Sequence, residues 1–150
     1  MNPPLRTAAD RAALQDGLAA GVIDVLATAH APHAAAEKAR GFMDAPFGIV
    51  GLETAVSLIM ELLYHTGRLT MEQIVLACAV RPARIIGAAP RTLAPGAPAN
   101  LTLIDPDCSI TVARAEFASQ STNTPFENRR LRGAVCATLV DGRPVFVRNR

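Results

Sequence analysis

The first part of the chain carries a helix pattern followed by a strand pattern. Thr7 and Asp10 have the spacing of a capping box, so we expect a helix that begins there and ends near Gly17. Residues 22–28 form a short apolar run rich in β-branched side chains, which is typical of a strand buried on both faces of a parallel sheet. This predicted strand ends abruptly in the sequence A-H-A-P-H at residues 29–33.

Two further helices are predicted after a loop with glycine and proline at residues 34–51. Apolar residues recur at helical spacing over residues 56–63, which indicates a helix that packs against the strand. Thr70 and Gln73 form a second capping box and begin the next helix. That helix should stop near Arg81-Pro82, because the residue before a proline disfavours the helical conformation.

A β-rich pattern takes over in the last third of the chain. β-prone runs lie at residues 100–105, 134–140 and 144–147, and Asp141-Gly142 between the last two is a strong hairpin signal. A β-rich unit of this size needs another part of the protein to pack against.

The order of these elements predicts the fold class α/β. A strand, then helices, then a β-rich appendix is typical of the last strand-helix units of a (β/α)8 barrel followed by a small C-terminal β-rich accessory unit. We place the barrel portion at residues 1–92 and the accessory unit at residues 93–150.

The composition argues against several classes of protein, namely nucleic-acid binders, membrane proteins and secreted proteins. The chain has 150 residues and a net charge of +2, and its clustered arginines (Arg129, Arg130, Arg132) are too few to indicate a nucleic-acid binder. It has neither an apolar run long enough for a membrane span nor a secretory signal, so a cytoplasmic location is expected. The three cysteines form no C-x-x-C pair and are expected to be buried and reduced.

Candidate chemistry begins at His30 and His33, which follow the predicted strand where barrel enzymes place their reactive groups. Two histidines do not complete a metal site, and the remaining one, His65, lies on a helix that faces elsewhere. No Ser/His/Asp or Cys/His arrangement emerges. The glycines of Gly48-Ile-Val-Gly51 can present backbone N–H groups to an anion or simply start a helix.

Several motifs together resemble the bacterial class of dihydroorotases, in that family's order and spacing. They are residues 23–33, which contain A-T-A-H-A-P-H (residues 27–33), the Glu37-Lys38 loop, A-P-F-G-I-V-G-L-E (residues 45–53), P-A-R-I (residues 82–85) and N-T-P-F-E (residues 123–127). The resemblance runs nearly from end to end and implies the C-terminal part of an amidohydrolase-superfamily (β/α)8 barrel. It also implies the zinc-dependent interconversion of dihydroorotate and N-carbamoyl-L-aspartate in pyrimidine biosynthesis.

The same resemblance implies site residues. Asn2 and His33 correspond to substrate contacts, and Phe47 and Gly48 match the loop whose backbone holds the substrate. The family's pattern is T-D-H-A-P-H, in which the aspartate binds the metal and shuttles a proton, whereas this chain has Ala29 there. A methyl group can do neither, and His30 should point to the other face of the strand. We therefore predict no catalytic residue, no metal ligand and no activity of this chain alone.

Three hypotheses for the function stay open. The chain is a dihydroorotase segment whose site another polypeptide completes with the missing barrel portion, or a noncatalytic dihydroorotase-like scaffold for aspartate transcarbamoylase. The third hypothesis is a truncated gene product whose motifs record only its ancestry.

Overall fold

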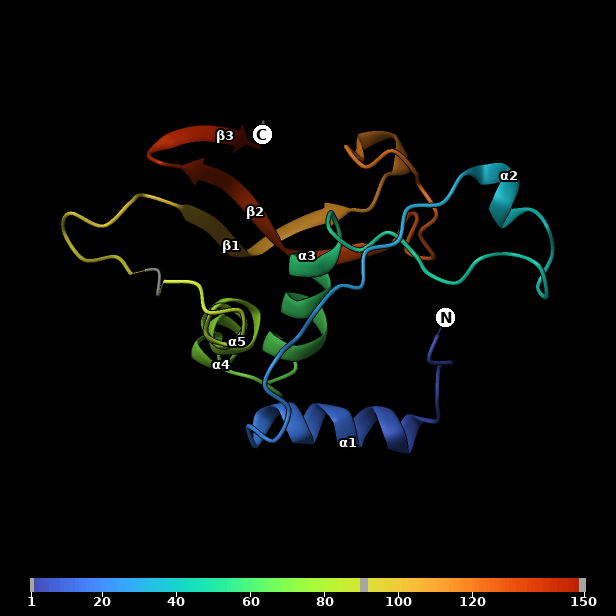
Figure 1. Ribbon diagram of the computed structural model, residues 1–150, viewed down its shortest axis with the longest axis horizontal. Helices are drawn as coiled ribbons and strands as arrows, with labels where there is room; N and C mark the ends of the chain where they lie inside the picture. Colours follow the sequence, from blue (N-terminus) through green and yellow to red (C-terminus); the bar gives the residue numbers. More distant parts are fainter. Residues whose placement is uncertain (1, 90–91, 149–150) are drawn as a thin grey trace.

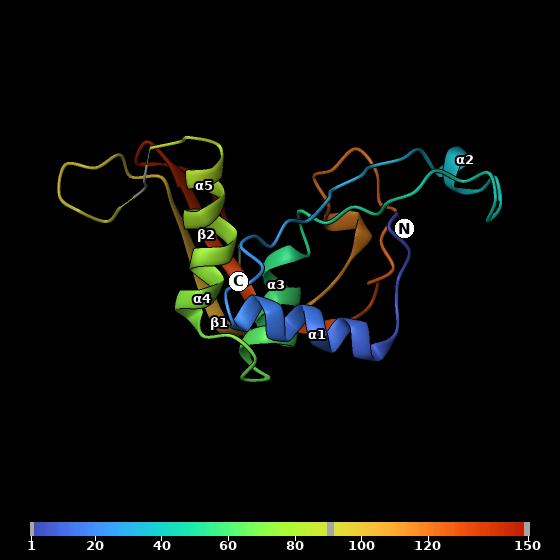
Figure 2. The same ribbon diagram turned by 60° about the horizontal axis from the view of Figure 1, so that its bottom comes forward.

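The computed structural model describes residues 2–89 and 92–148. Helices and sheet form separate layers, seen from two directions in Figure 1 and Figure 2. The sheet lies on one side, α3 (Ala55–Ile59) packs beneath it, and α1 (Ala8–Ala19) crosses on the side away from the sheet. The loop around α2 (Ala35–Lys38) projects from this body. Among the described residues, no helix has both the length and the apolar character needed to cross a membrane.

Both predicted capping boxes are confirmed. The Thr7 hydroxyl accepts the Asp10 N–H at 3.2 Å while the Asp10 carboxylate accepts the Thr7 N–H at 3.0 Å. Thr70 and Gln73 make the reciprocal pair at the start of α4 (Met71–Val75). Each pair satisfies two N–H groups that a helix start leaves without intrahelical partners, which fixes where α1 and α4 begin. The first helix runs past Gly17 to Ala19.

The second and third predicted helices each contain a π-helical segment. α3 continues as η1 (Met60–Tyr64), and α4 continues as η2 (Leu76–Val80) and α5 (Arg81–Ile85). The prediction that the last helix stops near Arg81-Pro82 is therefore wrong. In the wider π turn the Arg81 N–H donates to the Leu76 carbonyl, and Pro82 enters the first turn of α5, where its missing N–H is not required.

The predicted strand at residues 22–28 is also wrong, because these residues form no strand. A strand needs a neighbouring strand for its backbone groups, and this segment bonds to helices instead. The Val22 and Ile23 N–H groups donate to the Gly17 carbonyl at 2.9 and 3.1 Å, and the Leu26 N–H donates to the Ala77 carbonyl at 3.1 Å. Beyond it, the Ala31 N–H donates to the Ile49 carbonyl at 2.9 Å. The α/β character holds, whereas the description as barrel units stays a prediction.

The predicted β-rich region forms a three-stranded antiparallel sheet in the order β1-β2-β3. Its strands are β1 (Leu101–Thr111), β2 (Arg130–Val140) and β3 (Arg143–Val147), and the β1–β2 connection contains the short helix η3 (Arg114–Glu116). The hairpin at Asp141-Gly142 is confirmed, since Val140 pairs with Arg143 across it. The β1–β2 register shifts between Asp105 and Ser109.

One helix face docks the sheet through polar side chains spaced four residues apart. The Ser57 hydroxyl donates to the Gly133 carbonyl at 2.6 Å. The Glu61 carboxylate accepts two hydrogen bonds from the Arg132 guanidinium, at 2.9 and 3.0 Å. His65 Nε2 lies 2.7 Å from the Pro106 carbonyl. Because residues i, i+4 and i+8 share a helix face, these contacts fix the sheet along the whole of α3 and η1. The division at residue 92 stays a prediction.

The apolar core lies between the helices. Met60, Leu63, Leu69 and Ile74 are buried together, and Leu18 of α1 packs against them. Leu131 and Ala134 are buried on the sheet side. The three cysteines are free, as expected, but Cys78 is exposed and Cys108 and Cys136 are half-buried, so their expected burial is wrong.

The Glu61–Arg132 pair predicts an acid-sensitive component of stability. Hydrogen bonds from the Arg132 side chain and N–H lower the pKa of Glu61 to about 2 from 4.5. A depressed folded-state pKa stabilises the protein above pH 4.5, and this contribution is lost as the pH falls towards 2. Because the Arg132 side chain is half exposed and solvent screens the ion pair, we expect this contribution to be small.

Urea unfolding of the wild type and Glu61→Gln at pH 6 and pH 2.5 checks this expectation. The two proteins should differ in unfolding free energy at pH 6 and converge at pH 2.5. An equal difference at both pH values would contradict the assignment.

Candidate functional site

Three segments that are far apart in the sequence meet beside the sheet (Figure 1). They are the A-H-A-P-H loop (residues 29–33), the P-F-G loop (residues 46–48) and the S-T-N loop (residues 121–123). His33 Nε2 lies 2.8 Å from the Phe47 carbonyl oxygen, and the Val50 N–H donates to the Asn123 carbonyl at 3.2 Å. The structure thus brings together His33, Phe47 and Gly48, three of the predicted site residues.

His33 is held by its own chain on both sides of the ring. A carbonyl oxygen only accepts, so the Nε2 that faces Phe47 carries a proton in this arrangement. Nδ1 lies 3.8 Å from the Glu37 carboxylate on α2. The His33 side chain keeps 26% of its surface exposed, so it can still contact a bound molecule.

The P-F-G loop is fixed by an ammonium group and a close backbone approach. Lys38 Nζ donates to the Pro46 carbonyl at 2.8 Å and to the Gly48 carbonyl at 3.1 Å. Gly48 has φ 108°, and a Cβ there would lie 2.4 Å from the Cβ of Ala31, so only glycine fits. Neither the Gly48 N–H nor the Ile49 N–H donates to an acceptor in the described part of the chain. These two groups are therefore free to bind an anionic ligand.

Asn2 and Ala29 stand apart from this arrangement. Asn2 is exposed and makes no hydrogen bond to the described residues of the three loops. Ala29 is exposed and has φ 45°, a left-handed backbone conformation that aspartate and asparagine adopt more readily than alanine. The backbone at position 29 thus suits the aspartate of the family pattern although the side chain lacks a carboxylate.

His30 has a role that the sequence did not indicate. Its Nδ1 accepts hydrogen bonds from the N–H groups of Gly51 at 3.1 Å and Leu52 at 3.3 Å, so this nitrogen is not available to bind a metal. Residue 30 also does not lie on a strand. The Gly51 N–H is consequently unavailable to an anion. Since Nδ1 accepts, the proton of the neutral ring lies on Nε2, which is 3.5 Å from the Ser119 hydroxyl. A ring in this tautomer cannot take a proton from Ser119, which argues against a serine nucleophile here.

Glu53 lies next to His30, because both side chains contact Ser119. Both the N–H and the hydroxyl of Ser119 donate to Glu53 Oε1. Burial acts to raise the pKa of Glu53, but the hydrogen bonds from Ser119 outweigh it, and the pKa lies below its ordinary value. Glu53 is thus an ionised carboxylate at neutral pH. Its Oε2 atom is buried without a hydrogen-bond partner in the described residues, as is the hydroxyl of Thr54.

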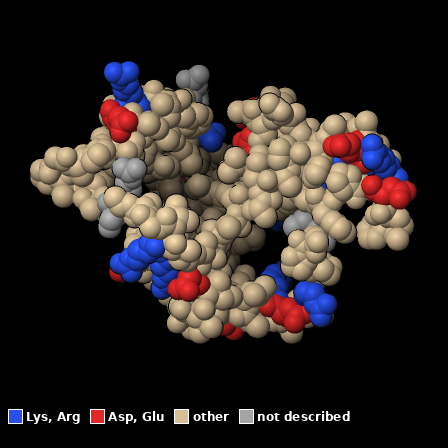
Figure 3. Space-filling model, in the orientation of Figure 1, with Lys and Arg blue, Asp and Glu red and all other residues tan. Residues whose placement is uncertain are grey.

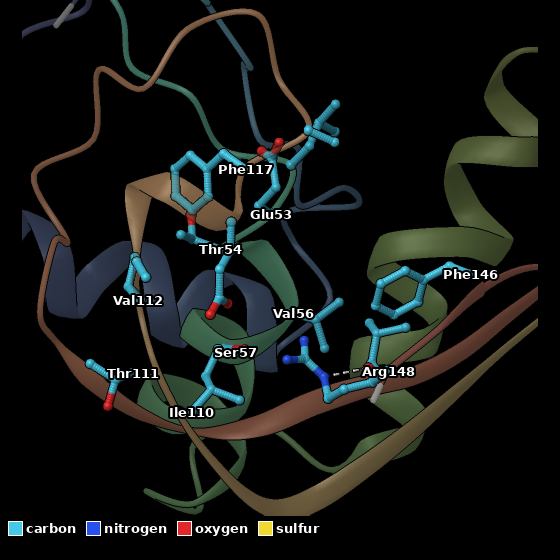
Figure 4. A pocket seen from close by; sticks show the side chains of 15 residues that line it. Glu53, Thr54, Val56, Ser57, Ile110, Thr111, Val112, Phe117, Phe146 and Arg148 are labelled. Atoms are coloured by element: carbon cyan, nitrogen blue, oxygen red, sulfur yellow. Dashed lines mark hydrogen bonds between the residues drawn. The ribbon is translucent and has the colours of Figure 1, made fainter. Parts of the chain in front are cut away.

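Glu53 and Thr54 line a cavity of about 370 Å³ between α3 and the sheet (Figure 4). Phe117 lies on one side of this cavity, and Phe146 and Arg148 lie on the other. Figure 3 shows a hollow in this face with mostly uncharged surface around it, a basic and an acidic group at its rim, and further charges at the periphery of the molecule. None of the predicted site residues lines the cavity, so it is separate from the three loops.

The described residues do not fit a zinc ion by themselves. No group of three or more His, Cys, Asp or Glu side chains within residues 2–89 and 92–148 is placed to bind a metal. Ala29 has no donor atom, and the Nδ1 of His30 is occupied by two backbone N–H groups. No proton transfer or metal contact is therefore assigned to position 29.

Asn123 and Lys38 are the main residues that sequence reasoning missed. The N-T-P-F-E motif is visible in the sequence, but its asparagine indicates only a turn, whereas its side chain bonds to both other loops. The only available signal is that this motif recurs in the family pattern. Lys38 belongs to the Glu37-Lys38 loop of the resemblance, but the sequence does not indicate its role, because its acceptors are backbone carbonyls whose positions only the folded loop defines.

The comparisons with known proteins agree with these motifs. A sequence profile of the amidohydrolase family matches residues 2–145. The dihydroorotase of Pelotomaculum thermopropionicum is 52% identical over 146 residues, which are 97% of this chain and 34% of that protein. The dihydroorotase of Brevibacillus brevis is 48% identical over the same shares.

Solved structures show the same relationship. The L-hydantoinase (dihydropyrimidinase) of Arthrobacter aurescens superposes with a TM-score of 0.88 and 32% identity, covering 95% of this chain and 33% of that one. The chain thus spans about a third of the length of the relatives it matches. It belongs to the amidohydrolase family, within which its sequence corresponds to part of a dihydroorotase.

Proposed function

We propose that this chain carries the substrate-binding loops of a dihydroorotase-type site but not the groups needed for turnover. The observation that supports this most is the 2.8 Å contact between His33 and the Phe47 carbonyl, which joins two motifs shared with dihydroorotases. The ligand in this proposal is dihydroorotate or N-carbamoyl-L-aspartate. The second carries two carboxylates, which suit the free N–H groups of Gly48 and Ile49, while the His33 ring holds the Phe47 carbonyl of the same loop.

Catalytic turnover needs groups other than those that bind the substrate. Dihydroorotases are metal-dependent amidohydrolases, and the proposed substrate site needs a group that takes up and returns a proton beside the scissile amide. Ala29 cannot do this. Because the chain matches only a third of its relatives' length, we propose that another polypeptide region completes the site in the cytoplasm.

One observation favours a second candidate, the noncatalytic scaffold for aspartate transcarbamoylase. Ala29 has a left-handed backbone, which aspartate adopts more readily than alanine, so the position suits the family's aspartate in shape but lacks its carboxylate.

Ligand binding tests the first proposal directly. On titrating ¹⁵N-labelled protein with N-carbamoyl-L-aspartate, we expect shifts of the His33, Gly48 and Ile49 amide signals. His33→Ala should weaken binding roughly tenfold, because the P-F-G loop loses the hydrogen bond from His33 to the Phe47 carbonyl.

N-carbamoyl-β-alanine, which lacks one of the two carboxylates, serves as the control ligand and should bind more weakly. Absence of shifts in the three amides, or equal affinity of the wild type and His33→Ala, would show that these loops do not form the substrate site.

A further inference from the structure

We propose that Asn123 is the positioning residue of this site, because its side chain sets His33 and the P-F-G loop in their relative places. The contacts are seen in the structure, whereas the role of these loops in holding a ligand rests on the proposed function. The sequence motif alone indicates only a turn at this position.

The Asn123 side chain forms hydrogen bonds through both its nitrogen and its oxygen. Nδ2 donates to the Ala31 carbonyl at 3.0 Å and to the Gly48 carbonyl at 3.2 Å. Oδ1 accepts the His33 N–H at 3.2 Å and lies 2.8 Å from the Ser121 hydroxyl. An amide offers two donors and two acceptor lone pairs. Both donors and one lone pair have partners here, and the Ser121 hydroxyl, which also donates to the His33 carbonyl, lies beside the other lone pair. One side chain therefore bridges both loops that carry the proposed ligand contacts.

These contacts also fix which way the amide faces. A backbone N–H must meet Oδ1, and two carbonyl oxygens must meet Nδ2, so the reverse orientation would oppose like groups. Aspartate has the same shape but no donor. At position 123 it would place a carboxylate oxygen against the carbonyls of Ala31 and Gly48 while leaving the acceptor side intact.

The Gly48 carbonyl connects this contact to the free N–H groups. It is held from two directions, by Asn123 Nδ2 and by Lys38 Nζ. In a trans peptide the C=O and the following N–H point in opposite directions, so holding the Gly48 carbonyl inward turns the Ile49 N–H outward. Asn123 thereby orients a donor that no acceptor in the described part of the chain uses.

The backbone of this loop is anchored independently of the amide. The Asn123 carbonyl accepts the Val50 N–H, and the next carbonyl, of Thr124, accepts from Arg114 Nη2 at 3.1 Å. Thr124 is itself buried. A substitution that changes only the side chain of residue 123 should therefore leave the loop attached and the protein folded.

Asn123→Asp in the full chain is the test, with Asn128→Asp as the matched control. Asn128 is exposed, and its side chain makes no hydrogen bond to the described residues. The first readout is the ¹⁵N ring spectrum of His33, in which a fixed Nε2–H reports the bond to the Phe47 carbonyl. The second is the dissociation constant for N-carbamoyl-L-aspartate.

We expect Asn123→Asp to lose the fixed Nε2–H signature of His33 and to weaken binding at least about tenfold, while its urea unfolding stays cooperative. Asn128→Asp should change neither readout. An unchanged His33 ring spectrum in Asn123→Asp overturns the proposal, as does loss of the signature in both variants. Should the wild type not bind the ligand, the proposed function is wrong, and the ring spectrum alone then decides whether Asn123 positions His33.

Discussion

A chimera carrying the substitution Ala29→Asp should turn over dihydroorotate at least about 100-fold faster than the same chimera with Ala29, because a positioned acid/base contributes a factor of that order. In this chimera the present chain replaces the matching 146 residues of the Pelotomaculum thermopropionicum dihydroorotase, and the remaining two-thirds of that enzyme supplies the rest of the site. Ala29→Asp is expected to fold, since position 29 is exposed and its φ of 45° suits aspartate better than alanine.

The measurement is the initial rate of N-carbamoyl-L-aspartate formation, with bound zinc determined alongside it. Ala29→Ser provides a matched control, because it adds a small polar side chain without a carboxylate and should stay close to the unsubstituted chimera. Equal rates for the chimeras with and without Ala29→Asp would show that this position does not limit turnover.

Gly133→Ala should be the most destabilising small substitution in the chain, at about 3 kcal/mol. Gly133 has φ 93°, and a Cβ there would lie 2.3 Å from the Cβ of Met60, a residue that is 1% exposed. Met60 cannot withdraw, because it is packed between the helices and the sheet. The Gly133 carbonyl also accepts a hydrogen bond from the Ser57 hydroxyl. If the added methyl group pushes β2 away from α3, this buried hydrogen bond breaks as well.

Gly96→Ala separates the steric effect from the backbone effect. Gly96 has φ 87°, but nothing lies within 4 Å of a Cβ added there, so this variant should lose only about 1 kcal/mol. Urea unfolding of the two variants gives both values. A cost for Gly133→Ala no larger than that for Gly96→Ala would mean that the contact with Met60 relaxes.

Much of the local structure follows from the sequence because the signals lie within a few residues. The capping boxes of Thr7 and Thr70 and the hairpin at Asp141-Gly142 each depend on neighbours in the chain, and all three are confirmed. The family assignment was equally accessible, because the order and spacing of short motifs persist in the sequence itself. It also located His33, Phe47 and Gly48, which meet in the structure.

Only the tertiary structure decided the features that need distant partners. Residues 22–28 have the composition of a strand, yet a strand exists only where a neighbour supplies its hydrogen bonds. The helix through Pro82 continues because a π turn forms before it. The contacts of His30 and Asn123 join positions 21 to 92 residues apart, and neither composition nor periodicity carries information about such pairs.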